Sequence, residues 1–172
     1  MDEPRILIAG IGNIFLGDDA FGVEVVQRLA RRTLPVEARV VDFGIRGLDL
    51  GFALLDGYET VILIDAVARG GAPGTLYVLE PEPEPIDDPQ PEDLLIETHN
   101  MDPARVLRFA AAMGAPVRRV LLIGCEPRPP DSAQDMPMQL SPEMRAAVDE
   151  AVALTESMLV EIDPLSRQRC RT

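Results

Sequence analysis

The chain has 172 residues and a formal net charge of −13, and a single domain of this length buries ~70% of the surface of its unfolded chain. The negative charge argues against nucleic acid or an anionic membrane as the main partner, because both would repel the protein. No apolar run reaches the ~18 residues of a membrane-spanning helix, and the acidic N-terminus lacks the basic residues of a signal peptide. We therefore expect a cytoplasmic protein that forms one domain over residues 1–172.

Several enzyme classes are excluded by the residue types that the chain lacks. All 16 basic residues are arginines, so no lysine is present for a Walker A loop, a pyridoxal-phosphate Schiff base or general-base chemistry. The serines all lie in the last third of the chain, and none stands in the G-x-S-x-G elbow of a serine hydrolase. The two cysteines, Cys125 and Cys170, are expected to be reduced.

The first half of the chain alternates apolar runs with helical patterns. Residues 6–9 predict a strand, and a glycine-rich turn after it leads into apolar residues at helical spacing, namely Phe21, Val25, Val26 and Leu29. Residues 39–43 predict a second strand and 48–55 a short helix. Residues 60–64 form the continuous β-branched run of a strand buried on both faces. Three strands separated by helices indicate a parallel α/β core.

The next segments predict a strand of opposite direction and a surface loop. The link after Asp65 holds three glycines and a proline. It is too short for a parallel crossover, so the strand at 75–79 should run antiparallel to the others. Residues 80–97 are rich in proline and acid, which is typical of a solvated surface loop. The functional alternative is a docking surface for an arginine-rich segment of a partner.

The last part of the chain predicts helix, strand, helix. Asp102 and Pro103 have the pattern of a helix N-cap followed by proline at the first helical position. Residues 119–123 predict the last buried strand. Ser141 should cap a C-terminal helix whose apolar face comprises Met144, Val148, Ala151, Val152 and Leu159. The tail at 164–172 is expected to fray.

Asp19, Asp65 and His99 form the candidate site. Asp19 follows the first predicted strand, Asp65 ends the third, and His99 is the only histidine. Functional groups of open α/β sheets gather where neighbouring connections leave in opposite directions. If the second and third strands flank the first, the two carboxylates face each other across that crevice. Two carboxylates and one imidazole are a ligand set suited to a divalent metal such as nickel, zinc or manganese.

Each of these residues also has a structural alternative. Asp18 or Asp19 could cap the helix that begins near Ala20, and Asp65 could accept hydrogen bonds from amides of the following turn. A lone histidine is more often structural than catalytic. The nearby glycines do not complete the G-x-G-x-x-G pattern of a dinucleotide site. They are expected to permit a tight turn and close backbone approach at Gly10, Gly12 and Gly17.

Three stretches of the sequence together resemble one family. These are ILIAGIGNIFLGDDAFG, VILIDAV and THNMDP, and the similarity to the nickel-iron hydrogenase maturation endopeptidases covers most of residues 5–125. The resemblance implies a three-layer α/β/α sandwich with a mixed, mostly parallel five-stranded sheet whose fourth strand is antiparallel. It also implies an endopeptidase that removes a short C-terminal extension from the hydrogenase large-subunit precursor after nickel insertion.

The resemblance also implies roles for individual residues. The family's metal-contacting positions match Asp19, Asp65 and His99, with nickel supplied by the substrate and no tightly bound cofactor of the enzyme's own. Many members carry glutamate at the position of Asp19. Many also have D-G-G-T-x-G where this chain has DFGIRG at residues 42–47. Gly44, Arg46 and Gly47 in that segment are candidates for holding the substrate peptide.

Two other functions stay open at this stage. Cys125 ends a predicted strand at the same sheet edge, so it could act as a nucleophile with His99 as its base. A small buried residue at a strand end is the structural alternative for Cys125. The chain could also be a non-catalytic, nickel-dependent chaperone for the large subunit.

Overall fold

A computed structural model describes residues 5–81, 102–129 and 138–162 of the protein. His99 and Cys170 lie outside these residues. So do most of the predicted acidic loop at 80–97 and the predicted frayed tail at 164–172, so those predictions are not addressed by the structure.

The described residues form one five-stranded sheet, as predicted. The strands are β1 (Ile6–Ile11), β2 (Ala38–Gly44), β3 (Thr60–Ala66), β4 (Leu76–Leu79) and β5 (Arg119–Cys125), in the spatial order β2-β1-β3-β5-β4. All neighbours pair in parallel except β4, which is antiparallel to β5. The antiparallel direction predicted from the short glycine-rich link is therefore confirmed.

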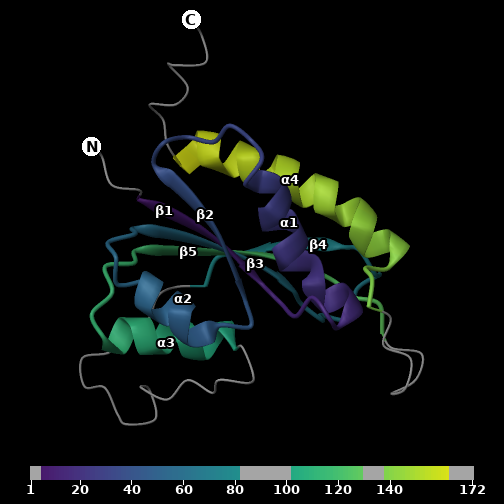
Figure 1. The fold of residues 1–172 in the computed structure, drawn as a ribbon, viewed down its shortest axis with the longest axis horizontal. Helices are drawn as coiled ribbons and strands as arrows, with labels where there is room; N and C mark the ends of the chain where they lie inside the picture. Colours follow the sequence, from purple (N-terminus) through teal and green to yellow (C-terminus); the bar gives the residue numbers. More distant parts are fainter. Residues whose placement is uncertain (1–4, 82–101, 130–137, 163–172) are drawn as a thin grey trace, which may run out of the picture.

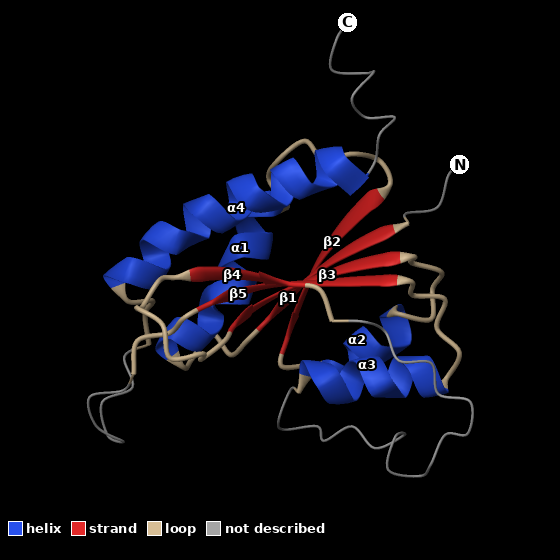
Figure 2. Ribbon diagram, turned by 180° about the vertical axis from the view of Figure 1, so that it is seen from behind, coloured by secondary structure: helices blue, strands red, loops and turns tan. Residues whose placement is uncertain are grey.

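Helices cover both faces of the sheet and give three layers (Figures 1 and 2). The helices α1 (Phe21–Leu29) and α4 (Pro142–Ile162) pack on one face, and α2 (Gly47–Ala53) and α3 (Pro103–Ala112) pack on the other. Alternate residues of the buried strands supply the two cores, because successive side chains of a strand point to opposite faces. In β3, Ile62 and Ile64 face α1 and α4, whereas Val61 and Leu63 face α2 and α3.

The helix signals in the sequence are confirmed. The Asp102 carboxylate accepts a hydrogen bond from the amide of Ala104 at 3.0 Å, and Pro103 opens α3. The Ser141 hydroxyl accepts from the amide of Met144 at 3.3 Å at the start of α4. The five apolar residues predicted for α4 are all buried. No helix of the described part of the chain is both long and apolar enough to cross a membrane.

Glycines allow the connection after β1 to pack closely against the rest of the fold. Gly12 has φ +133°, and a Cβ there would lie 1.7 Å from the carbonyl oxygen of Asp19. Gly22, at the start of α1, approaches the carbonyl oxygen of Ile64 so closely that a Cβ would lie 2.0 Å from it. These contacts hold the start of α1 against the carboxyl ends of β1 and β3, where the candidate site lies.

A buried carboxylate organises the link between β3 and β4. Glu126 is only 5% exposed, and it accepts hydrogen bonds from the amides of Arg69 (2.8 Å) and Gly70 (3.0 Å) and from the Tyr77 hydroxyl (2.8 Å). Burial alone would raise the pKa of Glu126, but these donors, with the amide of Gly71, hold it below its usual value. The charged carboxylate is thus satisfied, and it fixes the turn that sends β4 back along β5.

Candidate active site

Asp19 and Asp65 lie at the point where the connections from the sheet diverge. β2 pairs with one edge of β1 and β3 with the other, which is the arrangement that the prediction required. Asp19 lies in the one-turn helix η1 (Gly17–Ala20) after β1, and Asp65 stands one residue before the end of β3. The negative charge of Asp19 raises the pKa of Asp65, so the two carboxylates are close enough to repel each other.

Asp19 is held by backbone of the connection that follows β1. Its carboxylate accepts a hydrogen bond from the amide of Asn13 at 2.7 Å, and its own amide donates to the carbonyl of Leu16 at 3.1 Å. Neither η1 nor α1 has a side-chain cap. The alternative role of Asp18 or Asp19 as a helix cap is therefore wrong. Asp18 instead accepts hydrogen bonds from Arg128 and Ser141.

Asp65 is a carboxyl group whose charged form is disfavoured. Burial raises its pKa most, the charge of Asp19 raises it further, and a hydrogen bond from the amide of Ala66 at 2.8 Å lowers it, with a net result of about 7. In the described part of the chain the amide that donates to Asp65 is that of the last residue of β3, so the structural alternative, with amides of the following turn as donors, is not supported. A carboxyl group with a pKa near neutrality can both accept and donate a proton under physiological conditions.

Three predicted peptide-holding residues lie at the end of β2. Gly44 has φ +54°, and its carbonyl accepts from the amide of Gly12 at 3.0 Å. The Arg46 guanidinium donates to the carbonyl of Phe43 at 3.1 Å and to the carbonyl of Asp42. Gly47 begins α2. In the free protein Arg46 therefore holds the carboxyl end of β2, next to β1 and its connection.

Cys125 lies on the other face of the sheet from Asp65. It has no exposed surface and packs among the residues beneath α1 and α4. Burial raises the pKa of its thiol to about 12, and nearby carboxylates, Asp18 first, raise it as well. A nucleophilic cysteine needs access and a lowered pKa, so the structure argues against the cysteine-hydrolase hypothesis.

The described residues contain no group of three His, Cys, Asp or Glu side chains arranged to hold a metal ion. Asp19 and Asp65 are two of the three predicted metal-contacting residues, and the third, His99, lies outside the described part. A cavity of about 300 Å³ lies beside the amino end of β5 and is lined by Leu54, Leu107 and Val117 among others. It contains none of the predicted site residues.

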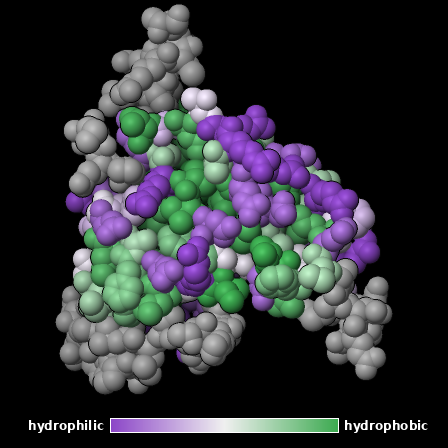
Figure 3. All heavy atoms as spheres, viewed as in Figure 1, coloured by the Kyte–Doolittle hydropathy of each residue, from purple (hydrophilic) through white to green (hydrophobic). Residues whose placement is uncertain are grey.

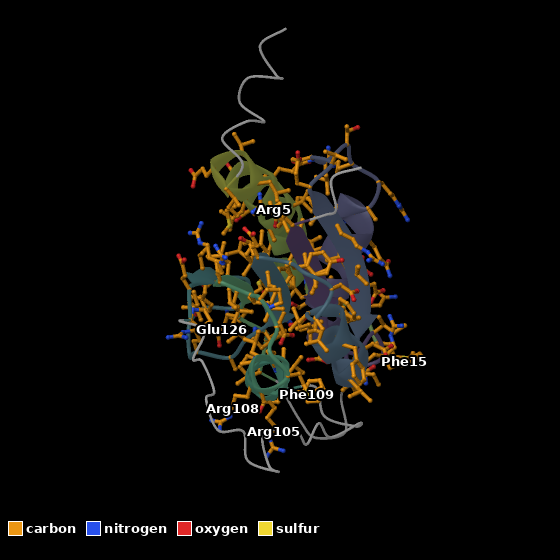
Figure 4. All side chains as sticks on the ribbon, turned by 90° about the vertical axis from the view of Figure 1, so that its left-hand side faces the viewer. Arg5, Phe15, Arg105, Arg108, Phe109 and Glu126 are labelled. Carbon is orange, nitrogen blue, oxygen red and sulfur yellow. The ribbon has the colours of Figure 1, made fainter. Side chains whose placement is uncertain are left out.

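Exposed apolar side chains that the sequence analysis did not single out follow β1 and β2 along the chain. Ile14, Phe15 and Leu16 are exposed in the connection from β1 to η1, and Ile45, Leu48 and Phe52 are exposed at the end of β2 and on α2. We call these six residues the apolar rim. Figure 3 shows apolar surface over α2 and beside the start of α1 on one face of the molecule. Phe15 is 63% exposed and points away from the body of the protein (Figure 4).

Comparison with known proteins gives one consistent result. The family model HycI, described as hydrogenase maturation protease, matches residues 23–158. The hydrogenase expression/formation protein HupD of Rhodobacter capsulatus is 35% identical over 150 residues, covering 87% of this chain and 68% of that protein.

Solved structures agree with this result. A hydrogenase 2 maturation peptidase from Thaumarchaeota archaeon SCGC_AB-539-E09 is 34% identical, with a TM-score of 0.66 over 90% of this chain and 97% of the other. The hydrogenase maturating endopeptidase HybD from E. coli is 27% identical, with a TM-score of 0.66 over 91% and 93%. The non-catalytic chaperone hypothesis loses its support, since these relatives are peptidases. The chain belongs to the hydrogenase maturation protease family and is a peptidase that acts in hydrogenase processing.

Proposed function

We propose that the protein is the endopeptidase that removes a C-terminal extension from the large-subunit precursor of a nickel-iron hydrogenase once nickel has been inserted. The nickel arrives with the precursor and is part of the substrate. Asp19, Asp65 and His99 contact it, and this contact places the scissile bond at the crevice. The protein has no tightly bound cofactor of its own under this proposal.

The observation that carries the proposal is the pair of carboxylates at the carboxyl ends of β1 and β3. Two negative charges that repel each other in the free protein favour the binding of a cation between them. Burial raises the pKa of Asp65 most and the charge of Asp19 raises it further, so a cation bound beside it would favour its ionised form. Nickel in an open site of the precursor supplies the charge, so binding favours precursor that has been loaded over precursor that has not.

The same residues can support hydrolysis. The ionised Asp65 carboxylate can accept a proton from a water molecule as the water attacks the scissile carbonyl, and the protonated form can return that proton to the leaving amine. The nickel of the substrate can act as a Lewis acid or polarise the water. Both routes need Asp65 close to the metal and to the peptide bond.

The surroundings of the carboxylates fit a polypeptide substrate. Gly44, Arg46 and Gly47 lie at the end of β2, where Gly44 pairs with Ile11 of β1, and we place an extended peptide there. The apolar rim offers contact area beyond the peptide itself, and exposed apolar patches commonly mark protein interaction sites. We therefore place the folded part of the precursor against the apolar rim and the C-terminal extension in the crevice.

The test is cleavage of purified full-length precursor, followed by intact mass. Nickel-loaded precursor should lose the mass of its C-terminal extension when incubated with the protein, and nickel-free precursor should stay uncut. Asp19→Asn should fail to process the loaded precursor. The matched control is Asp149→Asn, which removes a surface carboxylate of α4 paired with Arg28, and it should cleave like the wild type.

Either of two results would overturn the proposal. One is full cleavage of the nickel-free precursor by the wild type. The other is no cleavage of the loaded precursor by wild-type protein that is folded.

A further inference from the structure

Asp18 is adjacent to Asp19 in η1, but its carboxylate contacts a different part of the chain. Oδ1 accepts from the amide of Ser141 at 2.6 Å, and Oδ2 accepts from the Ser141 hydroxyl at 2.9 Å and from the amide of Arg128 at 2.8 Å. Arg128 follows β5 and Ser141 precedes α4. One carboxylate therefore joins η1 to both described ends of the β5–α4 connection.

The groups that Asp18 contacts are themselves firmly placed. The Ser141 hydroxyl also accepts from the amide of Met144, a residue of the first turn of α4 whose side chain is fully buried. The Arg128 guanidinium donates to both carboxylate oxygens of Glu143, at 2.6 and 2.8 Å, in the first turn of α4. Asp18 is thus attached to the packed end of the longest helix of the described chain.

By contrast, η1 has little internal stability. It is a single 3-10 turn of four residues without a side-chain cap, and such turns have poor hydrogen-bond geometry. On the β1 side, the Asp19 carboxylate has the hydrogen bond from the Asn13 amide. Besides the close packing at Gly12 and Gly22, the contacts of Asp18 give this turn a second, long-range attachment.

We propose that Asp18 is a positioning residue of the active site. Its three hydrogen bonds hold η1 against the start of α4 and so keep the Asp19 carboxylate beside Asp65. This inference deepens the proposed function and rests on it for the activity measurement. The two adjacent aspartates therefore have separate tasks: Asp18 places the turn, and Asp19 meets the substrate.

The first test is a structural measurement on the free protein and needs no substrate. The amide of Asn13 donates to Asp19, so its exchange with solvent reports whether Asp19 stays in place. In Asp18→Ala, with the fold retained by NMR, we expect this amide to exchange about tenfold faster. The matched control is Asp149→Ala, which removes an ion pair between α1 and α4 away from the site and should leave the Asn13 amide unchanged.

The second test separates positioning from general stability through kinetics on loaded precursor. Asp18→Ala should lower kcat by about 10- to 100-fold with KM within about twofold, because a displacement of about 1 Å of a reacting group costs up to ~10²-fold in rate. Asp18→Asn keeps one acceptor oxygen and should fall between this variant and the wild type. Asp149→Ala should keep the wild-type kcat even if its thermal midpoint falls as much as that of Asp18→Ala.

The outcomes are distinguishable. If folded Asp18→Ala keeps both the Asn13 amide protection and the wild-type kcat, the inference is overturned. If wild-type protein fails to cut the precursor, the proposed function fails, and the Asn13 comparison still decides the role of Asp18. If Asp18→Ala does not fold, Asp18→Asn is measured in its place, and wild-type values there would contradict the inference.

Discussion

Asp65 and Glu126 differ in the hydrogen bonds that their carboxylates receive and in the direction of their pKa shifts. Both lie at the carboxyl ends of neighbouring strands, Asp65 at the end of β3 and Glu126 after β5. Glu126 receives hydrogen bonds from backbone amides and from Tyr77, and its pKa is lowered. Among the described residues Asp65 receives one, from Ala66, and it faces the negative charge of Asp19, so its pKa is raised to about 7.

Under the proposed function, this difference separates a structural carboxylate, Glu126, from one that meets the substrate, Asp65. A buried carboxylate surrounded by donors stabilises the fold and has no spare capacity for a ligand. A carboxylate short of donors costs stability in the free protein, and a cation or a proton relieves that cost. Under the proposed function, Glu126, on the β4 side, stabilises the fold, and Asp65, on the β1 side, contacts the substrate.

The largest expected effect is on catalysis. Asp65→Asn should lower processing of loaded precursor by about 10²- to 10⁴-fold, the range for losing a group that transfers protons, while circular dichroism stays unchanged. Glu126→Gln, the same change at the other carboxylate, should keep processing within a few-fold of the wild type. The mass of the precursor after a fixed time measures processing by both variants. An equal loss of processing in Asp65→Asn and Glu126→Gln would contradict the different roles given to the two carboxylates.

The second effect is a pH-dependent gain in stability in Asp65→Asn. The folded pKa of Asp65 lies above its usual 3.8, so the wild type loses stability as pH rises from about 4 through about 7. One pKa unit corresponds to ~1.4 kcal/mol, so the difference between 3.8 and about 7 sets an upper bound of about 4 kcal/mol. Urea denaturation should show Asp65→Asn more stable than the wild type at pH 8 and similar to it at pH 4. A constant difference across this range would contradict the account.

Removing the Glu126 carboxylate should lower the stability of the fold, whereas Asp65→Asn should raise it. Glu126→Ala leaves the amides of residues 69 and 70 and the Tyr77 hydroxyl without their acceptor, and the loss of three hydrogen bonds to one charged acceptor destabilises a fold. We expect a fall of roughly 5 °C or more in the thermal midpoint at pH 7. Calorimetry of Glu126→Ala beside Asp65→Asn at pH 7 gives the comparison, and an unchanged midpoint in Glu126→Ala would show that the β3–β4 link does not depend on it.

A smaller effect is expected from the apolar rim. Phe15→Ser removes an exposed aromatic side chain next to the site and should raise KM for the precursor about tenfold, equivalent to ~1.4 kcal/mol of binding. Val36→Ser is the control, because Val36 is also 63% exposed but precedes β2 at the opposite end of that strand. The same KM in both variants would place the docking surface elsewhere.

The smallest effect is expected at Cys125. The thiol is buried beneath α1 and α4, so Cys125→Ala should cost some packing and leave processing within about threefold of the wild type. Loss of processing in folded Cys125→Ala would restore the thiol mechanism.

The sequence predicted most of the fold because its signals were local and consistent. The β-branched run of β3, the Asp102-Pro103 start of α3 and the short link before β4 each permit one structure. The placement of Asp19 and Asp65 at the same end of neighbouring strands followed from the order of the connections. Glu126 could not be found in this way, because its donors come from residues 49 to 57 positions away. Local patterns also cannot predict the hydrogen bond from Ser141 to Asp18, because the two residues are 123 positions apart.

The contrast between Asp65 and Glu126 is tested most directly by an NMR titration of the side-chain carboxyl groups of the free, metal-free protein. We expect Asp65 to titrate with an apparent pKa of about 7 and Glu126 to titrate below its usual value. In Asp19→Asn, the pKa of Asp65 should fall, because one source of its repulsion is gone. An Asp65 carboxyl that titrates near 4 in the wild type, or does not respond to Asp19→Asn, would contradict the account.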